Sequence, residues 1–133
     1  MCSLKRGRPG VSDALVCLMD LPASFAALAG QNIPVGDAPD SIDVLPALLG
    51  DTKAGRDKLV EHDGESMLGF RDRLWKFIEP DRRRKAKYSR EGELYDLGRD
   101  LGETNNLSPA QPETSRKLSG ELDAAAEGGR ANR

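Results

Sequence analysis

The stretch that decides the fold is Gly69-Phe70-Arg71-Asp72-Arg73-Leu74-Trp75-Lys76-Phe77-Ile78, followed after a basic connection by Glu93-Leu94-Tyr95-Asp96-Leu97. Both are short runs of apolar and aromatic residues separated by charged ones, a pattern typical of strands in a hairpin or meander. The expected strands are Lys58–His62, Ser66–Phe70, Leu74–Ile78 and Glu93–Leu97, with the middle two joined across Asp72-Arg73. Because no helix interrupts them, we expect an antiparallel sheet of about four strands.

A helix is expected after this sheet. Glu113–Glu127 places Leu118 and Leu122 on one helical face, and Gly128-Gly129 is expected to end the helix. The fold class that follows is α+β, with a small antiparallel sheet of about four strands, a C-terminal helix and short N-terminal helices.

The segment before the sheet predicts shorter elements. Leu15–Met19 is a continuous apolar run, as in a buried strand. Asp20 is in the position of a helix N-cap with Pro22 in the first turn, and Gly30 is expected to end that helix. Val44–Leu49 predicts one further helical turn, which Gly50 closes.

Composition limits the classes of function. The 133 residues are 38% hydrophobic, 5% aromatic and 32% charged, with a net charge of −2 that does not favour a nucleic-acid partner for the whole chain. The sequence has no apolar run long enough to cross a membrane and no signal-peptide pattern. We expect a flexible basic arm over residues 1–11, one foldable region over 12–127 and a disordered tail over 128–133.

Residues that could carry chemistry are few. The chain has one histidine, His62, which is interpreted either as a surface residue at a turn or as a substrate-binding residue at a pocket rim. The basic run Arg82–Lys87 is either a solvated loop or an anion-attracting patch. Arg6-Gly7-Arg8-Pro9 matches the core of an AT-hook, but the basic residues that normally follow are missing. No catalytic residue and no metal-ligand set is predicted.

Four segments taken in order resemble the C-terminal portion of arylsulfatase-type sulfatases, which belong to the alkaline-phosphatase-like superfamily. Asp20–Gly30 resembles D-L-x-P-T-x-x-x-L-A-G, and Asp40–Gly50 resembles D-G-x-S-L-x-P-L-L-x-G. Gly69–Ile78 resembles the hairpin a-x-R-d-g-r-W-K-y-I. Glu93–Leu107 resembles E-L-Y-D-L-x-x-D-P-x-E-x-x-N-L and is the most specific of the four. Departures from these patterns include Ser24 for Thr, Ser41 for Gly and Leu101 for Pro.

The resemblance implies sulfuric ester hydrolysis by a full-length protein, with a formylglycine nucleophile and a calcium ion that stabilises the sulfate charge. Formylglycine is made in a C-x-P-x-R motif, and neither Cys2 nor Cys17 lies in one. The calcium ligands of the family lie upstream of the part resembled. The expectation is therefore a fragment that holds no cofactor and is inactive alone. Its expected partner is a sulfatase catalytic domain or a second copy, with a sulfated substrate only in a full-length protein.

Other functions are left open by the residues. A free-standing protein-interaction module would keep the fold without the enzyme, and an AT-hook-like DNA-binding protein would use the arginines at residues 6–9. Full-length sulfatases are usually exported or lysosomal, whereas this sequence by itself gives no location.

Overall fold

The computed structural model describes residues 10–63, 67–80 and 91–131, with side chains described as far as residue 128. The chain divides into two compact units, Met1–Arg56 and Asp57–Arg133. The predicted basic arm, the Arg-Gly-Arg-Pro tetrapeptide and the Arg82–Lys87 run lie mainly or wholly outside the described residues.

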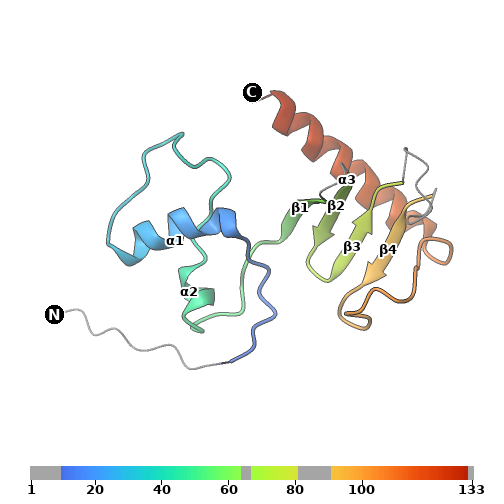
Figure 1. Ribbon diagram of the computed structural model, residues 1–133, viewed down its shortest axis with the longest axis horizontal. Coiled ribbons are helices and arrows are strands. Elements are labelled where there is room, and N and C mark those ends of the chain that lie inside the picture. The colour runs from blue at the N-terminus through green and yellow to red at the C-terminus, as the bar shows by residue number, and fades with distance from the viewer. Residues whose placement is uncertain (1–9, 64–66, 81–90, 132–133) are drawn as a thin grey trace. The chain divides into compact units, whose positions relative to one another are not determined.

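The second unit contains the sheet. Strands β1 (Lys58–His62), β2 (Leu68–Asp72), β3 (Trp75–Ile78) and β4 (Glu93–Asp96) are antiparallel and lie in sequence order, as Figure 1 shows. Each strand therefore pairs with its neighbour in the chain, so short turns are enough to connect most of them. The predicted fold class is confirmed, with its four-stranded antiparallel sheet, C-terminal helix and short N-terminal helices.

The core of this unit lies between the sheet and helix α3 (Pro112–Ala131), which packs on β2 and β3 (Figure 1). The register places Phe70 opposite Phe77 and Phe77 opposite Leu94, so the three side chains share one sheet face. Leu118 and Leu122 of α3 complete the buried cluster. By the same alternation, Gly69, Lys76 and Tyr95 lie on the face opposite to α3.

Several predicted boundaries differ from the structure. The hairpin turn is Arg73-Leu74 rather than Asp72-Arg73, because Arg73 adopts a left-handed conformation with φ of 54° that reverses the chain within two residues. The prediction that Gly128-Gly129 ends the last helix is wrong, since α3 continues to Ala131. The described part of the predicted tail, residues 128–131, is thus helical.

The first unit contains a 3₁₀ turn, η1 (Leu18–Asp20), and helices α1 (Leu21–Leu28) and α2 (Leu45–Leu48). Gly30 follows α1 with φ of 67° and Gly50 follows α2 with φ of 79°, so each glycine supplies the left-handed residue with which helices commonly end. Both helix ends were predicted from these glycines, and both predictions are confirmed.

The predicted buried strand over Leu15–Met19 is wrong. Residues 11–17 have no regular secondary structure, and Leu18 begins η1 with its side chain 83% exposed. A strand needs a neighbour for its backbone groups, and no strand in the described part of the first unit supplies one. The segment instead makes a backbone hydrogen bond from Arg56 N–H to the Leu15 carbonyl, 2.7 Å long.

Candidate functional site

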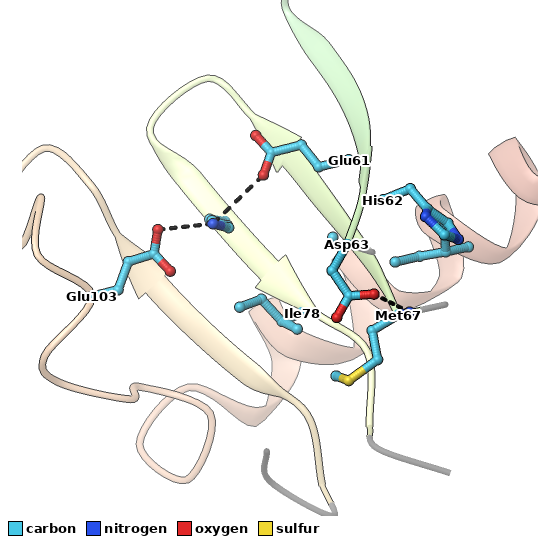
Figure 2. Close-up of a pocket in the computed structure, with 9 residues that line it drawn as sticks. Glu61, His62, Asp63, Met67, Ile78 and Glu103 are labelled. Atoms are coloured by element: carbon cyan, nitrogen blue, oxygen red, sulfur yellow. Dashed lines mark hydrogen bonds and ion pairs between the residues drawn. The ribbon is translucent and has the colours of Figure 1, made fainter. Parts of the chain in front are cut away.

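The candidate site is a cavity of about 330 Å³ in the second unit, at one end of the sheet (Figure 2). Its lining comes from three strands, from the residues next to β1 and β2 in their connection, and from the loop after β4, and it combines charged with apolar side chains. The lining residues are Glu61, His62, Asp63, Met67, Leu68, Gly69, Lys76, Ile78 and Glu103.

Lys76 occupies the centre of the charged part. Its Nζ lies 2.8 Å from Glu103 Oε1 and 3.5 Å from Glu61 Oε2, so the ammonium bridges two carboxylates (Figure 2). The Lys76 side chain is 18% exposed, against 35% for Glu61 and 32% for Glu103, so the ammonium lies deeper than either partner. The register places Glu61 opposite Gly69 and Lys76 opposite Arg71, two residues further along β2, so both side chains lie on the same face of the sheet.

Glu103 reaches the cavity from an ordered loop. Asp100 Oδ2 accepts hydrogen bonds from the backbone N–H groups of Asn105 and Thr104, both at 2.8 Å. The bond from Asn105 is the main reason that the pKa of Asp100 is lowered, and the bonds from Thr104 add to it. Glu103 itself has φ of 54°, an uncommon conformation for a residue with a side chain. The loop therefore fixes the direction from which Glu103 approaches Lys76.

Asn106 attaches the same loop to the sheet. Its Oδ1 accepts hydrogen bonds from Leu94 N–H at 3.1 Å and from Ser108 N–H at 2.9 Å. The backbone of Leu107 also donates to the Leu94 carbonyl at 2.8 Å. The segment Glu93–Leu107, the most specific part of the sequence pattern, thus builds the loop that presents Glu103.

Tyr95 lies beside Lys76 in the register of β3 and β4. Its hydroxyl donates to Glu93 Oε2 at 2.9 Å, and the side chain is buried. Burial, together with this hydrogen bond to Glu93, raises the pKa of Tyr95 to about 12. Tyr95 is therefore a neutral, fixed neighbour of the charged group at neutral pH.

The structure brings His62 to the cavity, but its ring does not join the charged cluster. His62 follows Glu61 on β1, so the two side chains leave opposite faces of the strand. Figure 2 shows the His62 ring directed away from Glu61 and Glu103. Asp63, the next residue, instead accepts a hydrogen bond from Met67 N–H at 2.7 Å and closes the connection between β1 and β2. A substrate contact by His62 stays a prediction.

Sequence reasoning did not find Glu61, Lys76 and Glu103 as a group. They come from three distant segments, and only the register of the sheet brings them together. A signal was nevertheless present, because Lys76 and Glu103 are both fixed positions of the sequence patterns quoted above, in the hairpin and in the loop segment.

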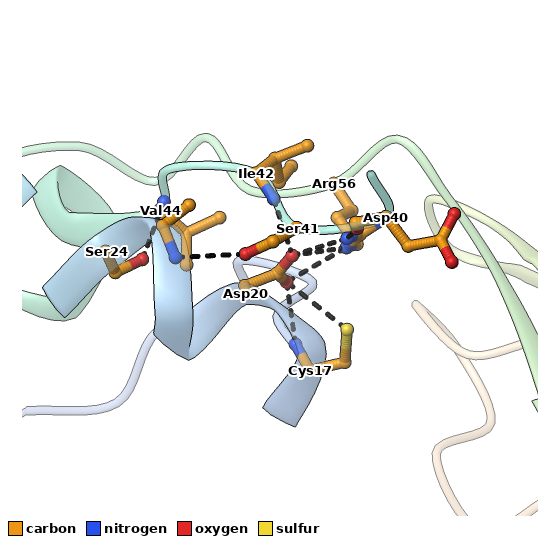
Figure 3. A network of polar contacts seen from close by, with 9 residues as sticks. Cys17, Asp20, Ser24, Asp40, Ser41, Ile42, Val44 and Arg56 are labelled. Atoms are coloured by element: carbon orange, nitrogen blue, oxygen red, sulfur yellow. Dashed lines mark hydrogen bonds and ion pairs between the residues drawn. The ribbon is translucent and has the colours of Figure 1, made fainter. Parts of the chain in front are cut away.

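A second polar network holds the first unit together (Figure 3). The Asp20 side chain is fully buried and accepts hydrogen bonds from Arg56 Nε at 2.7 and 2.9 Å, from Cys17 N–H at 3.0 Å and from Ile42 N–H at 3.3 Å. Burial alone would raise the pKa of Asp20, but the hydrogen bonds from Arg56, Cys17 and Ile42 outweigh it and lower the pKa from 3.8 to about 2. Arg56 also donates to the Asp40 carbonyl.

The predicted N-cap role of Asp20 is only partly correct. Asp20 directly precedes α1, but its side chain makes no capping bond to that helix. It points back toward Cys17 and across to Arg56, because a buried carboxylate is best stabilised by a cation and several N–H donors. Ser24 of α1 is also fully buried and accepts a hydrogen bond from Val44 N–H at 3.0 Å. These contacts join η1 and α1 to the segment around α2 and to Arg56.

Among the residues that the structure describes, no group of three histidine, cysteine or acidic side chains is arranged to hold a metal ion. Within the same residues, no helix is long and apolar enough to span a bilayer.

Comparison with known proteins gives the following relatives. No protein-family model matches the chain. An N-acetylgalactosamine-6-O-sulfatase of Bacteroides thetaiotaomicron is 34% identical over 125 residues, which are 88% of this chain and 24% of that protein. The chain thus spans about a quarter of the length of this curated relative.

Solved structures with a fold similar to that of this chain include the following two. A Bacteroides thetaiotaomicron protein designated BT33336S-sulf, from work on the metabolism of multiple glycosaminoglycans, is 35% identical and superposes with a TM-score of 0.71. The match covers 80% of this chain and 24% of that protein. BT4656, solved in complex with its substrate D-glucosamine-2-N,6-O-disulfate, has the same fold, with a TM-score of 0.56 at 18% identity over 81% of this chain and 23% of its own.

Proposed function

This chain is a C-terminal part of a sulfatase, and from that premise we propose that it completes a sulfuric ester hydrolase without being catalytic alone. The observation that carries the proposal is the match itself, which includes 88% of this chain but 24% of the related N-acetylgalactosamine-6-O-sulfatase. The printed sequence contains no C-x-P-x-R motif, so it offers no site for a formylglycine nucleophile. In this proposal the nucleophile and the calcium ligands belong to the catalytic domain that the chain completes.

The surface of α1 supports a partner of this kind. The helix sequence LPASFAAL is apolar on every side, and its one polar side chain, Ser24, faces inward. Phe25 is 57% exposed and Leu28 is 49% exposed. Helices that are apolar all round are typical of elements buried inside larger proteins.

Exposed apolar groups continue along the first unit. Leu18 and Met19 of η1 are 83% and 45% exposed, and Leu48 of α2 is 46% exposed. We therefore propose that a sulfatase catalytic domain covers this surface, and that the chain without it self-associates.

Sulfate release tests the catalytic part of the proposal. The purified chain is incubated with N-acetylgalactosamine 6-sulfate and calcium, and inorganic sulfate is measured by ion chromatography. We expect release no faster than in buffer, with an authentic sulfatase as the positive control. Calcium-dependent turnover by this chain alone would overturn the proposal that it is not catalytic.

A free-standing interaction module is the second candidate, and the same exposed surface on α1 favours it. The two proposals differ in the partner, which is a sulfatase catalytic domain in the first and an unrelated protein in the second. Paired substitution Phe25→Asp and Leu28→Asp would abolish either association, with Leu101→Asp in the loop after β4 as a control at an even more exposed apolar position. Recovery of sulfatase activity on association distinguishes the two.

A further inference from the structure

We propose that the cavity around Lys76 binds an uncharged, hydroxyl-bearing sugar ring and excludes the sulfate group. This inference rests on the proposed function, because it assigns a part of the sulfated glycan to this surface. It concerns only the described residues that line the cavity.

The charges of the cavity argue against sulfate. Around Lys76, Glu61 and Glu103 contribute two carboxylates, whereas Lys76 contributes one ammonium that already bridges them. The His62 ring leaves the opposite face of β1 and offers no compensating charge inside the cluster. A sulfate group would therefore enter a site of net negative charge and would compete with two carboxylates for one cation.

The hydrogen-bonding groups favour sugar hydroxyls. Ionised carboxylates only accept hydrogen bonds, and hydroxyl groups can donate to them without bringing charge. An ammonium has three N–H groups, and Lys76 donates one to Glu103 Oε1 at 2.8 Å while forming an ion pair with Glu61 at 3.5 Å, so we expect a further N–H to reach a sugar oxygen. The cluster thus presents several acceptors and one donor.

The rest of the lining supplies an apolar surface. Met67 and Ile78 line the same cavity, so the C–H face of a sugar ring has apolar side chains to contact. Gly69 forms part of the wall, and a Cβ there would lie 3.6 Å from Glu61 Cβ and 3.8 Å from Glu61 Oε2, so a side chain at this position would occupy space beside the Glu61 carboxylate. The volume of about 330 Å³ is at the lower end of small-molecule sites, which suits one sugar ring.

The test is a titration of the 133-residue chain followed by amide chemical shifts, with N-acetylgalactosamine and N-acetylgalactosamine 6-sulfate as matched probes. We expect N-acetylgalactosamine to shift the amides of Gly69, Lys76 and Glu103. The 6-sulfate is expected to bind about tenfold more weakly, and added salt should narrow that difference. No saturable shift at these amides with N-acetylgalactosamine, or equal or tighter binding of the 6-sulfate, would overturn the inference.

A double variant tests whether the charge of the cavity, rather than its shape, sets the preference against the 6-sulfate. Glu61→Gln with Glu103→Gln keeps the size of both side chains and removes two negative charges, so we expect the preference against the 6-sulfate to shrink to about threefold or less. Glu113→Gln, on an exposed residue at the start of α3, is the control and should keep the tenfold preference. An unchanged preference in the double variant would contradict the electrostatic argument.

The two proposals can fail separately. A chain that binds neither sugar but restores sulfatase activity to a catalytic domain would refute this inference and leave the proposed function intact. A chain that binds the neutral sugar as expected but supports no hydrolysis in any sulfatase would retain the site and refute the function.

Discussion

Removing the charge of Asp20 is expected to open the first unit. In the substitution Asp20→Asn, the carboxylate that accepts hydrogen bonds from Arg56, Cys17 and Ile42 becomes a neutral amide. The lowered pKa, about 2 instead of 3.8, corresponds to about 2.5 kcal/mol of stabilisation of the charged form. Arg56, whose side chain is 14% exposed, would also lose its partner. We therefore expect the free energy of unfolding of the first unit to fall by about 2–4 kcal/mol.

Native-state hydrogen exchange measures this loss within the unit concerned. The amide of Val44 is the reporter, because it donates to Ser24 and its own hydrogen bond is unchanged by the substitution. Its protection free energy should fall by the amount given above in Asp20→Asn. It should stay within about 0.5 kcal/mol of the native value in the control Asp37→Asn, since Asp37 is exposed. A decrease of less than about 0.5 kcal/mol in the Val44 protection free energy of Asp20→Asn would refute the reasoning.

The ion pair of Asp20 with Arg56 also predicts how the stability of the first unit depends on pH. Because the folded pKa of Asp20 is lowered, its contribution is fully present above pH 3.8 and is lost as the pH falls toward about 2. The native chain should therefore lose Val44 protection across this range, and Asp20→Asn should lose much less. Replacing both partners, Asp20→Asn with Arg56→Met, should recover part of the stability lost in the single variant.

Three further predictions concern the second unit. Leu94→Ala, at a fully buried core position, should lower the free energy of unfolding, measured by urea denaturation, by about 2–5 kcal/mol. Leu101→Ala, at an 83% exposed position, should change the free energy of unfolding by less than about 0.5 kcal/mol. Arg73→Gly should raise it by about 0.5–1 kcal/mol, because Arg73 has φ of 54° and its ion pair with Asp57 is exposed; a destabilised variant would show that the pair matters more. In a Tyr88→Phe background, absorbance titration of Tyr95 should give a pKa of about 12, and a value near 10 would contradict its burial and its bond to Glu93.

The sheet could be predicted from sequence because its signals are local. Lys58–His62 alternates as a strand should, and its predicted bounds are those of β1. The predicted hairpin turn was one residue too early. Arg73 occupies the left-handed position where the quoted hairpin pattern has glycine, and an arginine gives no sequence signal for a left-handed residue. The buried strand over Leu15–Met19 was wrong for the opposite reason. Its apolar residues indicate burial, but no strand in the described part of the first unit lies beside them to pair with.

The candidate site could be predicted only in part. His62 was predicted as a possible substrate-binding residue at a pocket rim because it is the one histidine of the sequence, and it does line the cavity. The charged centre was missed because Lys76 and Glu103 are 27 residues apart and carry no distinguishing chemistry until the Asp100 loop brings them to 2.8 Å. Long-range ion pairs of this kind depend on register and loop geometry, which periodicity in a single sequence does not reveal.

An exchange of segments tests the central claim most directly. This chain replaces the matching quarter of the related N-acetylgalactosamine-6-O-sulfatase, and sulfate release from N-acetylgalactosamine 6-sulfate is measured for the folded, soluble hybrid. The account predicts measurable calcium-dependent hydrolysis by the hybrid, lost when Phe25→Asp and Leu28→Asp are introduced and kept with Leu101→Asp. A hybrid that folds and releases no sulfate would contradict the claim that this chain completes a sulfatase.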